Sequence, residues 1–135
     1  MAEFFLHTQL AQDTFFVKDL KLSKLLLMND ARFPWVVLVP RQPDVKDLID
    51  LLPSSQRILL DEINRVSIFM KRYFKAEKLN IASIGNIVPQ LHMHIVARTS
   101  KDAAWPKPVW GFGEAVHYTD EKEKAIIAAL NQAVG

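Results

Sequence analysis

The chain has 135 residues, 50% of them hydrophobic and 24% charged, which is the size and composition of one globular domain. A formal net charge of +2 is too small to indicate a nucleic-acid partner, and no apolar run approaches the roughly 18 residues of a membrane span. The absence of cysteine excludes disulfides, thiolate metal ligands and a cysteine nucleophile. The first residues do not resemble a signal peptide, so we expect a cytoplasmic protein with a single domain over residues 1–135.

Three strands are predicted in the first forty residues, after a short helix over residues 3–11. The strands are rich in β-branched, aromatic and aliphatic side chains, and turn-forming residues separate the second strand from the third. Two strands joined by a short turn are most simply antiparallel neighbours. The predicted strands cover residues 13–20, 25–28 and 35–39.

Two helical patterns follow these strands. Asp44 is the expected N-cap of a short helix over residues 45–52. Pro53 suits the first turn of a longer helix, because the ring fixes a helical φ and the first turn needs no backbone donor. An apolar stripe at helical spacing carries this second helix to Phe74.

The second half of the chain adds two strands, a loop and a terminal helix. We expect strands over residues 80–84 and 90–98, and a loop rich in Trp, Pro and Gly over residues 99–118. Asp120 and Glu123 have the spacing of a capping box for the C-terminal helix. The order of strands, helix, strands and helix predicts an α+β domain with a mostly antiparallel sheet.

The most informative segment is residues 90–96, which read QLHMHIV. Side chains of a strand alternate between its two faces, so Gln90, His92 and His94 project together. Two imidazoles with Cβ atoms roughly 6–7 Å apart, and one amide, would then face a surface or a cleft rather than a buried layer. The opposite face is apolar and would pack under the helices; it carries Leu91, Met93 and Ile95.

Three chemistries can use such a row of side chains. Two histidines at i and i+2 can bind zinc, but a catalytic zinc site usually needs a third ligand, and His7 and His117 are remote in sequence. Two imidazoles can also form a general acid–base pair near neutral pH. One imidazole could instead attack phosphorus while its neighbours bind the phosphate oxygens. The spacing alone is equally compatible with two surface histidines that have no chemical role.

The residues before the histidines favour a phosphate ligand. Gly85 permits close backbone approach, and the amides of Asn80 and Asn86 can donate to phosphate oxygens. The sequence has no P-loop and no GxGxxG motif, so side chains and loop amides would hold the phosphate. A simple turn between two strands also explains Gly85 and Asn86, and the two interpretations are compatible.

Together with Asn80 and Gly85 upstream and Trp105 and Pro106 downstream, residues 90–96 resemble the histidine triad family of nucleotide hydrolases and transferases. The signature of that family is His-φ-His-φ-His-φ-φ, where φ is apolar. The resemblance extends from about residue 25 to the Trp-Pro loop. It implies an antiparallel sheet of about five strands, a long packed helix and terminal helices, usually in a homodimer.

The resemblance also implies a reaction and a set of site residues. His92 would attack the α-phosphate of a purine nucleotide and form a nucleotidyl-histidine intermediate, which water or another acceptor resolves. His94 would donate a hydrogen bond to the phosphate and to the departing atom. The implied substrates are dinucleoside polyphosphates and nucleoside phosphoramidates, with no cofactor and no metal. The other implied substrate contacts are Asn80, Gly85 and Asn86 at the phosphate, Asp30 at the ribose, Met28 at the base, and Trp105.

The chemistry of imidazole fits this role for His92. An ordinary imidazole has a pKa near 6.5, so most of it is neutral and nucleophilic at pH 7. A hydrogen bond from one ring nitrogen to a carbonyl would leave the lone pair of the other nitrogen free for phosphorus.

Two positions depart from the family pattern. Gln90 stands at the first signature position, and Trp35 stands where many members carry a histidine. Gln90 completes the predicted catalytic set with His92 and His94, since its amide can still accept and donate hydrogen bonds. Because an amide does not titrate, Gln90 cannot take part in a proton relay. The same two residues allow an alternative function, a nucleotide-binding or sensing module with little turnover. A metal-binding protein is a third possibility.

Overall fold

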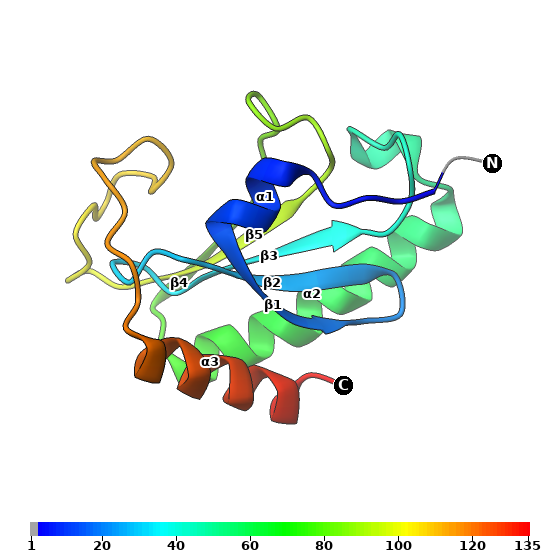
Figure 1. Ribbon diagram of the computed structural model, residues 1–135. Helices are drawn as coiled ribbons and strands as arrows, with labels where there is room; N and C mark the ends of the chain where they lie inside the picture. Colours follow the sequence, from blue (N-terminus) through cyan, green and yellow to red (C-terminus); the bar gives the residue numbers. More distant parts are fainter. Residues whose placement is uncertain (1–2) are drawn as a thin grey trace.

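Five strands form one antiparallel sheet in the order β1-β2-β3-β5-β4 in the computed structural model, which describes residues 3–135 (Figure 1). The predicted α+β class and the five-stranded antiparallel sheet are confirmed. The strand bounds agree with the predicted ones to within two residues, except that β5 begins three residues later than expected. The strands are β1 (Thr14–Asp19), β2 (Ser23–Met28), β3 (Trp35–Pro40), β4 (Lys78–Ser83) and β5 (Met93–Arg98).

Three α-helices accompany the sheet, and none of the helices in residues 3–135 is both long and apolar enough to cross a membrane. Pro53 occupies the first turn of the long helix, as predicted. Thr119 caps the last helix by accepting a hydrogen bond from the Lys122 amide, so the cap lies one residue before the predicted capping box. The helices are α1 (Thr8–Asp13), α2 (Pro53–Tyr73) and α3 (Asp120–Ala133).

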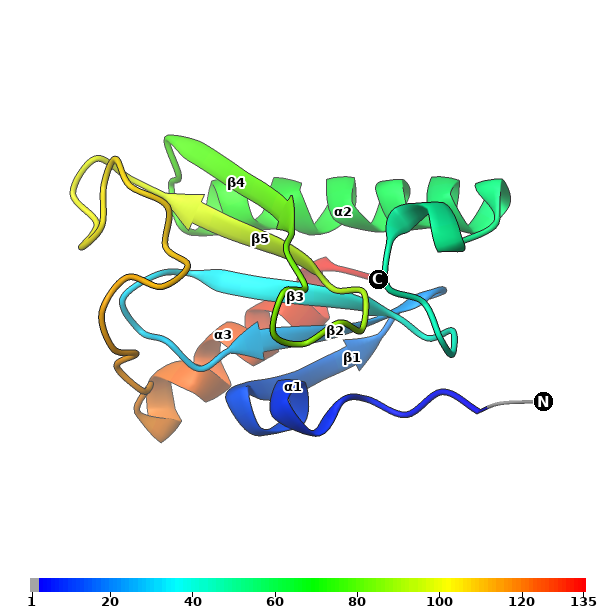
Figure 2. The same cartoon turned by 90° about the horizontal axis from the view of Figure 1, so that it is seen from above.

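The two faces of the sheet are covered in different ways (Figures 1 and 2). Helices α2 and α3 pack on one face, over a helix-face cluster that includes Leu25, Val36 and Ile95. Helix α1 and long loops cover the other face, over a site-face cluster that includes Trp35 and Val96. Because successive strand residues point to opposite faces, one apolar run such as β3 supplies both clusters.

The short helix predicted over residues 45–52 is wrong. Only a 3-10 turn, η1 (Leu48–Asp50), forms there, and its cap is Asp47 rather than Asp44. Asp44 adopts a left-handed φ of 58°, which turns the chain so that the Val45 side chain reaches the helix-face cluster. The Val45 carbonyl then accepts a hydrogen bond from the Leu91 amide, a tertiary contact that local patterns do not encode.

The helix predicted over residues 3–11 begins five residues late, at Thr8. Residues 3–7 are not helical because a distant side chain takes their backbone groups. The Gln90 amide donates to the Phe5 carbonyl and accepts from the His7 amide, at 2.9 Å in both cases.

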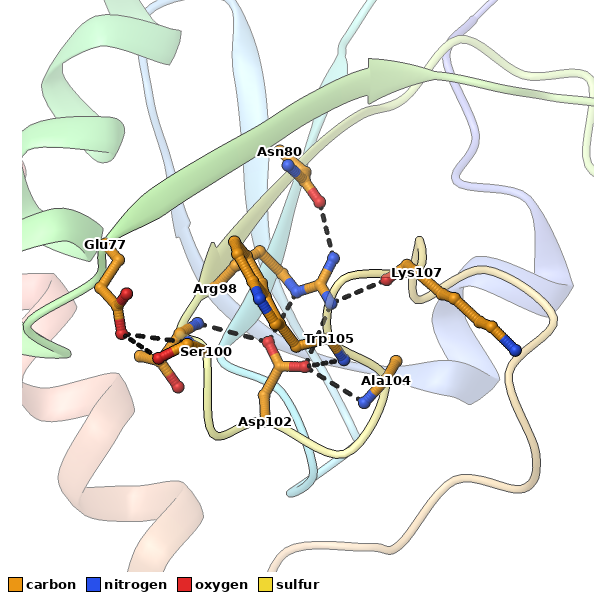
Figure 3. A network of polar contacts seen from close by, with 9 residues as sticks. Glu77, Asn80, Arg98, Ser100, Asp102, Ala104, Trp105 and Lys107 are labelled. Carbon is orange, nitrogen blue, oxygen red and sulfur yellow. Dashed lines mark hydrogen bonds and ion pairs between the residues drawn. The ribbon is translucent and has the colours of Figure 1, made fainter.

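A buried guanidinium fastens the loop that follows β5 (Figure 3). Arg98 is only 1% exposed; its Nε donates to Asp102 at 2.7 Å, and its other nitrogens donate to the Asn80 amide oxygen and the Lys107 carbonyl. The guanidinium also lies against the rings of Phe33 and Trp105. All three guanidinium nitrogens of Arg98 are therefore hydrogen-bonded, and they link residues 102–107 to Asn80 of β4.

This ion pair predicts a large effect for one conservative substitution. Asp102→Asn leaves the buried Arg98 charge uncompensated and should lower the free energy of unfolding by about 3–5 kcal/mol, measured by urea denaturation. Asp61→Asn is the matched control, because it breaks an exposed i,i+4 pair with Arg65 and should cost less than about 1 kcal/mol. Equal losses in the two variants would contradict the structural role of Arg98.

The stability difference between the wild type and Asp102→Asn should also depend on pH. Burial opposes ionisation of Asp102, but hydrogen bonds from Arg98 and from backbone amides outweigh it, so the pKa of the carboxyl is lowered. A carboxyl with a lowered pKa in the folded state contributes stability above its unfolded pKa and loses that stability as the pH falls through the folded pKa. The difference in the free energy of unfolding between the wild type and Asp102→Asn should therefore become smaller as the pH falls.

Candidate active site

A cavity of about 500 Å³ opens on the sheet face opposite α2 and α3, and both histidines of the QLHMHIV segment line it. Its walls come from α1, from the facing ends of β2 and β3, from the loop after β4, and from the loop that precedes α3. The described lining residues are Gln9, Leu10, Asp13, Met28, Trp35, Ile84, Gly85, Asn86, Ile87, Val88, His92, His94, Trp110 and Gly111.

His92 lies just before β5 rather than on a strand, and a hydrogen bond to a backbone carbonyl orients its ring. Its Nδ1 lies 2.7 Å from the carbonyl oxygen of Gln90. Because a carbonyl only accepts, Nδ1 carries the proton and Nε2 carries the lone pair. This is the arrangement expected for a nucleophilic imidazole. The Leu91 amide, bonded to the Val45 carbonyl, fixes the backbone between the two residues.

His94 is the second residue of β5 and has the opposite arrangement. The indole Nε1 of Trp35 donates to its Nδ1 at 3.0 Å. Since an indole nitrogen only donates, Nδ1 of His94 must be the acceptor, and the proton of the neutral ring lies on Nε2. The two imidazole rings are 4.7 Å apart between centroids, so a lone pair and an N–H donor lie side by side.

The two histidines face a cavity, one of the two settings predicted from the sequence, but their rings are almost completely buried in its wall. His92 and His94 are 7% and 4% exposed, because Trp110 packs its ring edge-on against His94 at 5.3 Å. Burial, and then the neighbouring His92, lower the pKa of His94 to about 3. His94 is therefore neutral at physiological pH.

Gln90 has a structural task that the sequence does not reveal. Its backbone carbonyl orients His92, while its side-chain amide binds the backbone of Phe5 and His7. The residues so held lead directly into α1, which supplies Gln9, Leu10 and Asp13 to the cavity wall. Gln90 thus lies behind His92 and ties the N-terminal segment to the site.

The loop after β4 brings Gly85 and Asn86 to the cavity beside the histidines, as the phosphate prediction requires. Gly85 has a φ of +67°, a conformation that L side chains rarely adopt, so glycine is required there by the turn itself. Asn86 is exposed and its amide is free to meet a ligand.

A second cavity of about 370 Å³ adjoins the first and shares Asp13, Met28, Trp35 and Gly111 with it. Asp30 lines this second cavity but is 3% exposed, and its carboxylate is hydrogen-bonded to Arg32 and to the Val116 amide. Burial opposes its ionisation, yet hydrogen bonds from Arg32 and from the Val116 amide lower the pKa of the carboxyl.

The bonds of Asp30 are unevenly shared between its two oxygens. Oδ1 accepts from the Arg32 backbone, the Arg32 Nε and the Val116 amide, whereas Oδ2 accepts only from Arg32 Nη2. Oδ2 is therefore the one oxygen of Asp30 with capacity for a ribose hydroxyl.

Two residues predicted from the sequence as substrate contacts lie outside both cavities. The Asn80 side-chain oxygen accepts from Arg98, and Trp105 covers that guanidinium (Figure 3). Trp110, which was not singled out from the sequence, is the tryptophan of that loop that lines the first cavity. The only sequence signal for it was the concentration of tryptophans in residues 99–118, which does not distinguish one ring from another.

No group of three or more His, Cys, Asp or Glu residues that could hold a metal ion occurs within residues 3–135. His92 and His94 therefore have no third protein ligand among the residues described. Their ring nitrogens Nδ1 are moreover already engaged with Gln90 and Trp35.

A known family model covers the histidine pair and the glycine loop. The chain matches the HIT domain over residues 9–101, which is more than half of its length. It belongs to the histidine triad family. Members of this family bind and process nucleotides, most of them as hydrolases or transferases.

Solved histidine triad proteins cover nearly the whole chain. One from Bradyrhizobium japonicum is 46% identical with a TM-score of 0.97, covering 99% of this chain and 100% of that chain. One from Marinobacter aquaeolei is 41% identical with a TM-score of 0.96, covering 98% and 97%. One from Sinorhizobium meliloti is 41% identical with a TM-score of 0.94, covering 96% of each chain. Comparison with curated proteins gave no match.

Removing the side-chain amide of Gln90 should loosen the N-terminal segment that it holds. Gln90→Leu keeps the size of the side chain but loses both bonds to residues 5–7, so the His7 amide should exchange its hydrogen about 2- to 10-fold faster. Hydrogen exchange followed by NMR measures this rate. Gln56→Leu is the control, since Gln56 bonds the carbonyls of Leu48 and Leu51 and should leave His7 unchanged. An unchanged His7 rate in Gln90→Leu would contradict the tether.

Proposed function

We propose that this histidine triad protein is a nucleotide phosphohydrolase or nucleotidyltransferase in which His92 attacks the α-phosphate of a purine nucleotide substrate. The observation that carries the proposal is the 2.7 Å hydrogen bond between His92 Nδ1 and the Gln90 carbonyl. It commits one ring nitrogen as a donor and leaves Nε2 as the nucleophilic atom. Burial of the ring limits competition from water for that lone pair.

The reaction would proceed in two displacements. His92 Nε2 forms a bond to the α-phosphorus while the bond to the leaving group breaks, giving a nucleotidyl-His92 intermediate. Water or another acceptor then attacks the same phosphorus and restores the imidazole. Throughout both steps the proton stays on His92 Nδ1 and is donated to the Gln90 carbonyl oxygen, which stabilises the positive charge that develops on the ring.

The surrounding groups supply donors and space for the substrate. The Nε2–H of His94, the Asn86 amide and the backbone at Gly85 lie around the first cavity, where they would bind the phosphate oxygens. The second cavity would take the nucleoside, with Met28 against the base and Asp30 Oδ2 at the ribose. Gln90 stands at the first triad position in this proposal and acts through the backbone rather than through proton transfer.

Removing the nucleophile tests this proposal. Wild-type protein mixed with diadenosine tetraphosphate should form an adenylyl adduct, detected by intact-protein mass spectrometry, and His92→Ala should form none. Turnover by His92→Ala should fall by about 10³-fold or more, while nucleotide binding measured by calorimetry persists. His7→Asn is the matched control, because it removes an imidazole outside the cavity and keeps an N-cap on α1.

The outcomes separate the two functions considered. Tight binding without adduct or product in wild-type protein would identify a binding or sensing module instead of an enzyme. Equal turnover by the wild type and His92→Ala would disprove the nucleophilic role of His92.

We also propose that two copies of the chain pair as a homodimer through the free edge of β4 and the adjoining face of α2. Strand β4 ends the sheet, and apolar side chains remain exposed on β4 and on α2. These exposed residues are Leu60, Ile68, Tyr73 and Ile81. Ile68→Glu should shift the sedimentation coefficient from that of a dimer toward that of a monomer. Phe16→Glu, an exposed apolar residue on the opposite edge strand β1, is the control and should not.

A further inference from the structure

The contact between Trp35 and His94 bears on which bond this site can break. We propose that Trp35 is a positioning residue that holds His94 as a permanent neutral hydrogen-bond donor, so that the site cleaves phosphoanhydrides in preference to phosphoramidates. This inference rests on the proposed function, in which His92 attacks phosphorus.

The geometry leaves His94 one protonation state. Trp35 Nε1–H points at His94 Nδ1 over 3.0 Å, and both side chains are buried. A proton on His94 Nδ1 would point directly at the Trp35 Nε1–H. Both N–H groups would then lack an acceptor in a buried site, which costs free energy. The neutral ring with its proton on Nε2 satisfies both partners.

No neighbouring group favours a charged His94. Across the sheet it faces Val37 of β3 and Ala82 of β4, and Trp110 closes its outer side. The ionisable groups among the described cavity-lining residues are His92, whose ring touches it, and Asp13, an exposed residue of α1 that accepts from Gln9. The Arg98–Asp102 pair lies on the same sheet face beyond Val96 and is paired internally. Burial and His92 accordingly lower the pKa of His94 to about 3.

A phosphoanhydride needs no acid at this position. The lone pair of His92 Nε2 forms the N–P bond, the P–O bond breaks, and its electron pair leaves on a phosphate oxygen. That oxygen belongs to a nucleotide whose terminal phosphate has a pKa near 6, so it departs as an anion, stabilised by the His94 Nε2–H bond. Water then attacks phosphorus and the N–P electron pair returns to Nε2. One proton of the water is released to solvent as the P–OH group forms, and the second is released when that group ionises.

A phosphoramidate makes a different demand. When its P–N bond breaks, the electron pair leaves on nitrogen, and that nitrogen must gain a proton to depart as a neutral amine. The one proton on His94 is the Nε2 proton, and giving it up would leave an imidazolate anion, because Trp35 denies the ring a second proton. Gln90 cannot supply one either. The amine would have to take its proton from solvent, in a buried site.

The first test compares the two bond types in the wild-type protein. Diadenosine tetraphosphate and adenosine 5′-phosphoramidate are each followed to the His92 adduct in single turnover at neutral pH. The anhydride should react about 10²-fold faster or more, since a general acid typically contributes that much to the loss of a poor leaving group.

The second test removes the indole donor and compares matched tryptophans. Trp35→Phe keeps a ring but deletes the bond to Nδ1, so the phosphoramidate rate relative to the anhydride rate should rise by about tenfold near pH 6. Trp110→Phe is the matched control, because Trp110 packs on the same imidazole but its Nε1 has no partner. In that variant the ratio of the two rates should remain at the wild-type value.

A readout independent of activity is the nitrogen NMR spectrum of the histidines. His94 should show the Nε2–H tautomer without titrating between about pH 5 and 8 in wild type and Trp110→Phe. In Trp35→Phe, Nδ1 should lose its hydrogen-bond shift, and His94 should begin to titrate at higher pH than in the wild type. These measurements on the wild type decide the tautomer even where a variant does not fold.

The outcomes keep this inference apart from the proposed function. An adduct that forms from the phosphoramidate as fast as from the anhydride, or a proton on His94 Nδ1, would overturn the inference while His92 remained the nucleophile. Absence of an adduct from both substrates would overturn the proposed function and, with it, the bond preference.

Discussion

The site face of the sheet depends on one buried cation. The Arg98 guanidinium donates to Asp102, Asn80 and the Lys107 carbonyl, and so holds the first part of the long loop, residues 102–107, in a fixed position. Trp110 follows this segment and packs against the ring of His94, which Trp35 also contacts. A buried ion pair outside the cavity thus fixes the start of the loop whose Trp110 helps to bury His94.

Two chemically identical side chains acquire opposite roles from their second nitrogen. An acceptor behind His92 leaves a lone pair on Nε2, and a donor behind His94 leaves a hydrogen there. Neither assignment requires a change of charge, so the pair is prepared before any ligand arrives. The division of labour comes from a carbonyl and an indole, and both are insensitive to pH.

The sequence predicts the parts of this protein that follow from periodicity. The strands, the long helix beginning at Pro53 and the pairing of His92 with His94 on one face all come from local patterns. The errors share one physical cause: contacts with residues distant in the sequence override the local pattern. Val45 is not helical because its side chain packs in the core and its carbonyl accepts from the Leu91 amide. Residues 3–7 are not helical because their backbone is hydrogen-bonded to the Gln90 side chain. Asn80 is claimed by Arg98, and no spacing rule separates Trp105 from Trp110.

The sheet also divides the molecule into two compartments with different freedom to vary. The helix-face cluster is built from regular elements that pack across many turns, whereas the site-face cluster is closed by loops and one short helix. Only main-chain atoms of the strands belong to both. Substitutions that reshape the loops over the cavity are therefore largely uncoupled from the packing of α2 and α3. A lineage could therefore change its ligand on one side of the sheet while the packing of the helix-face cluster stayed the same.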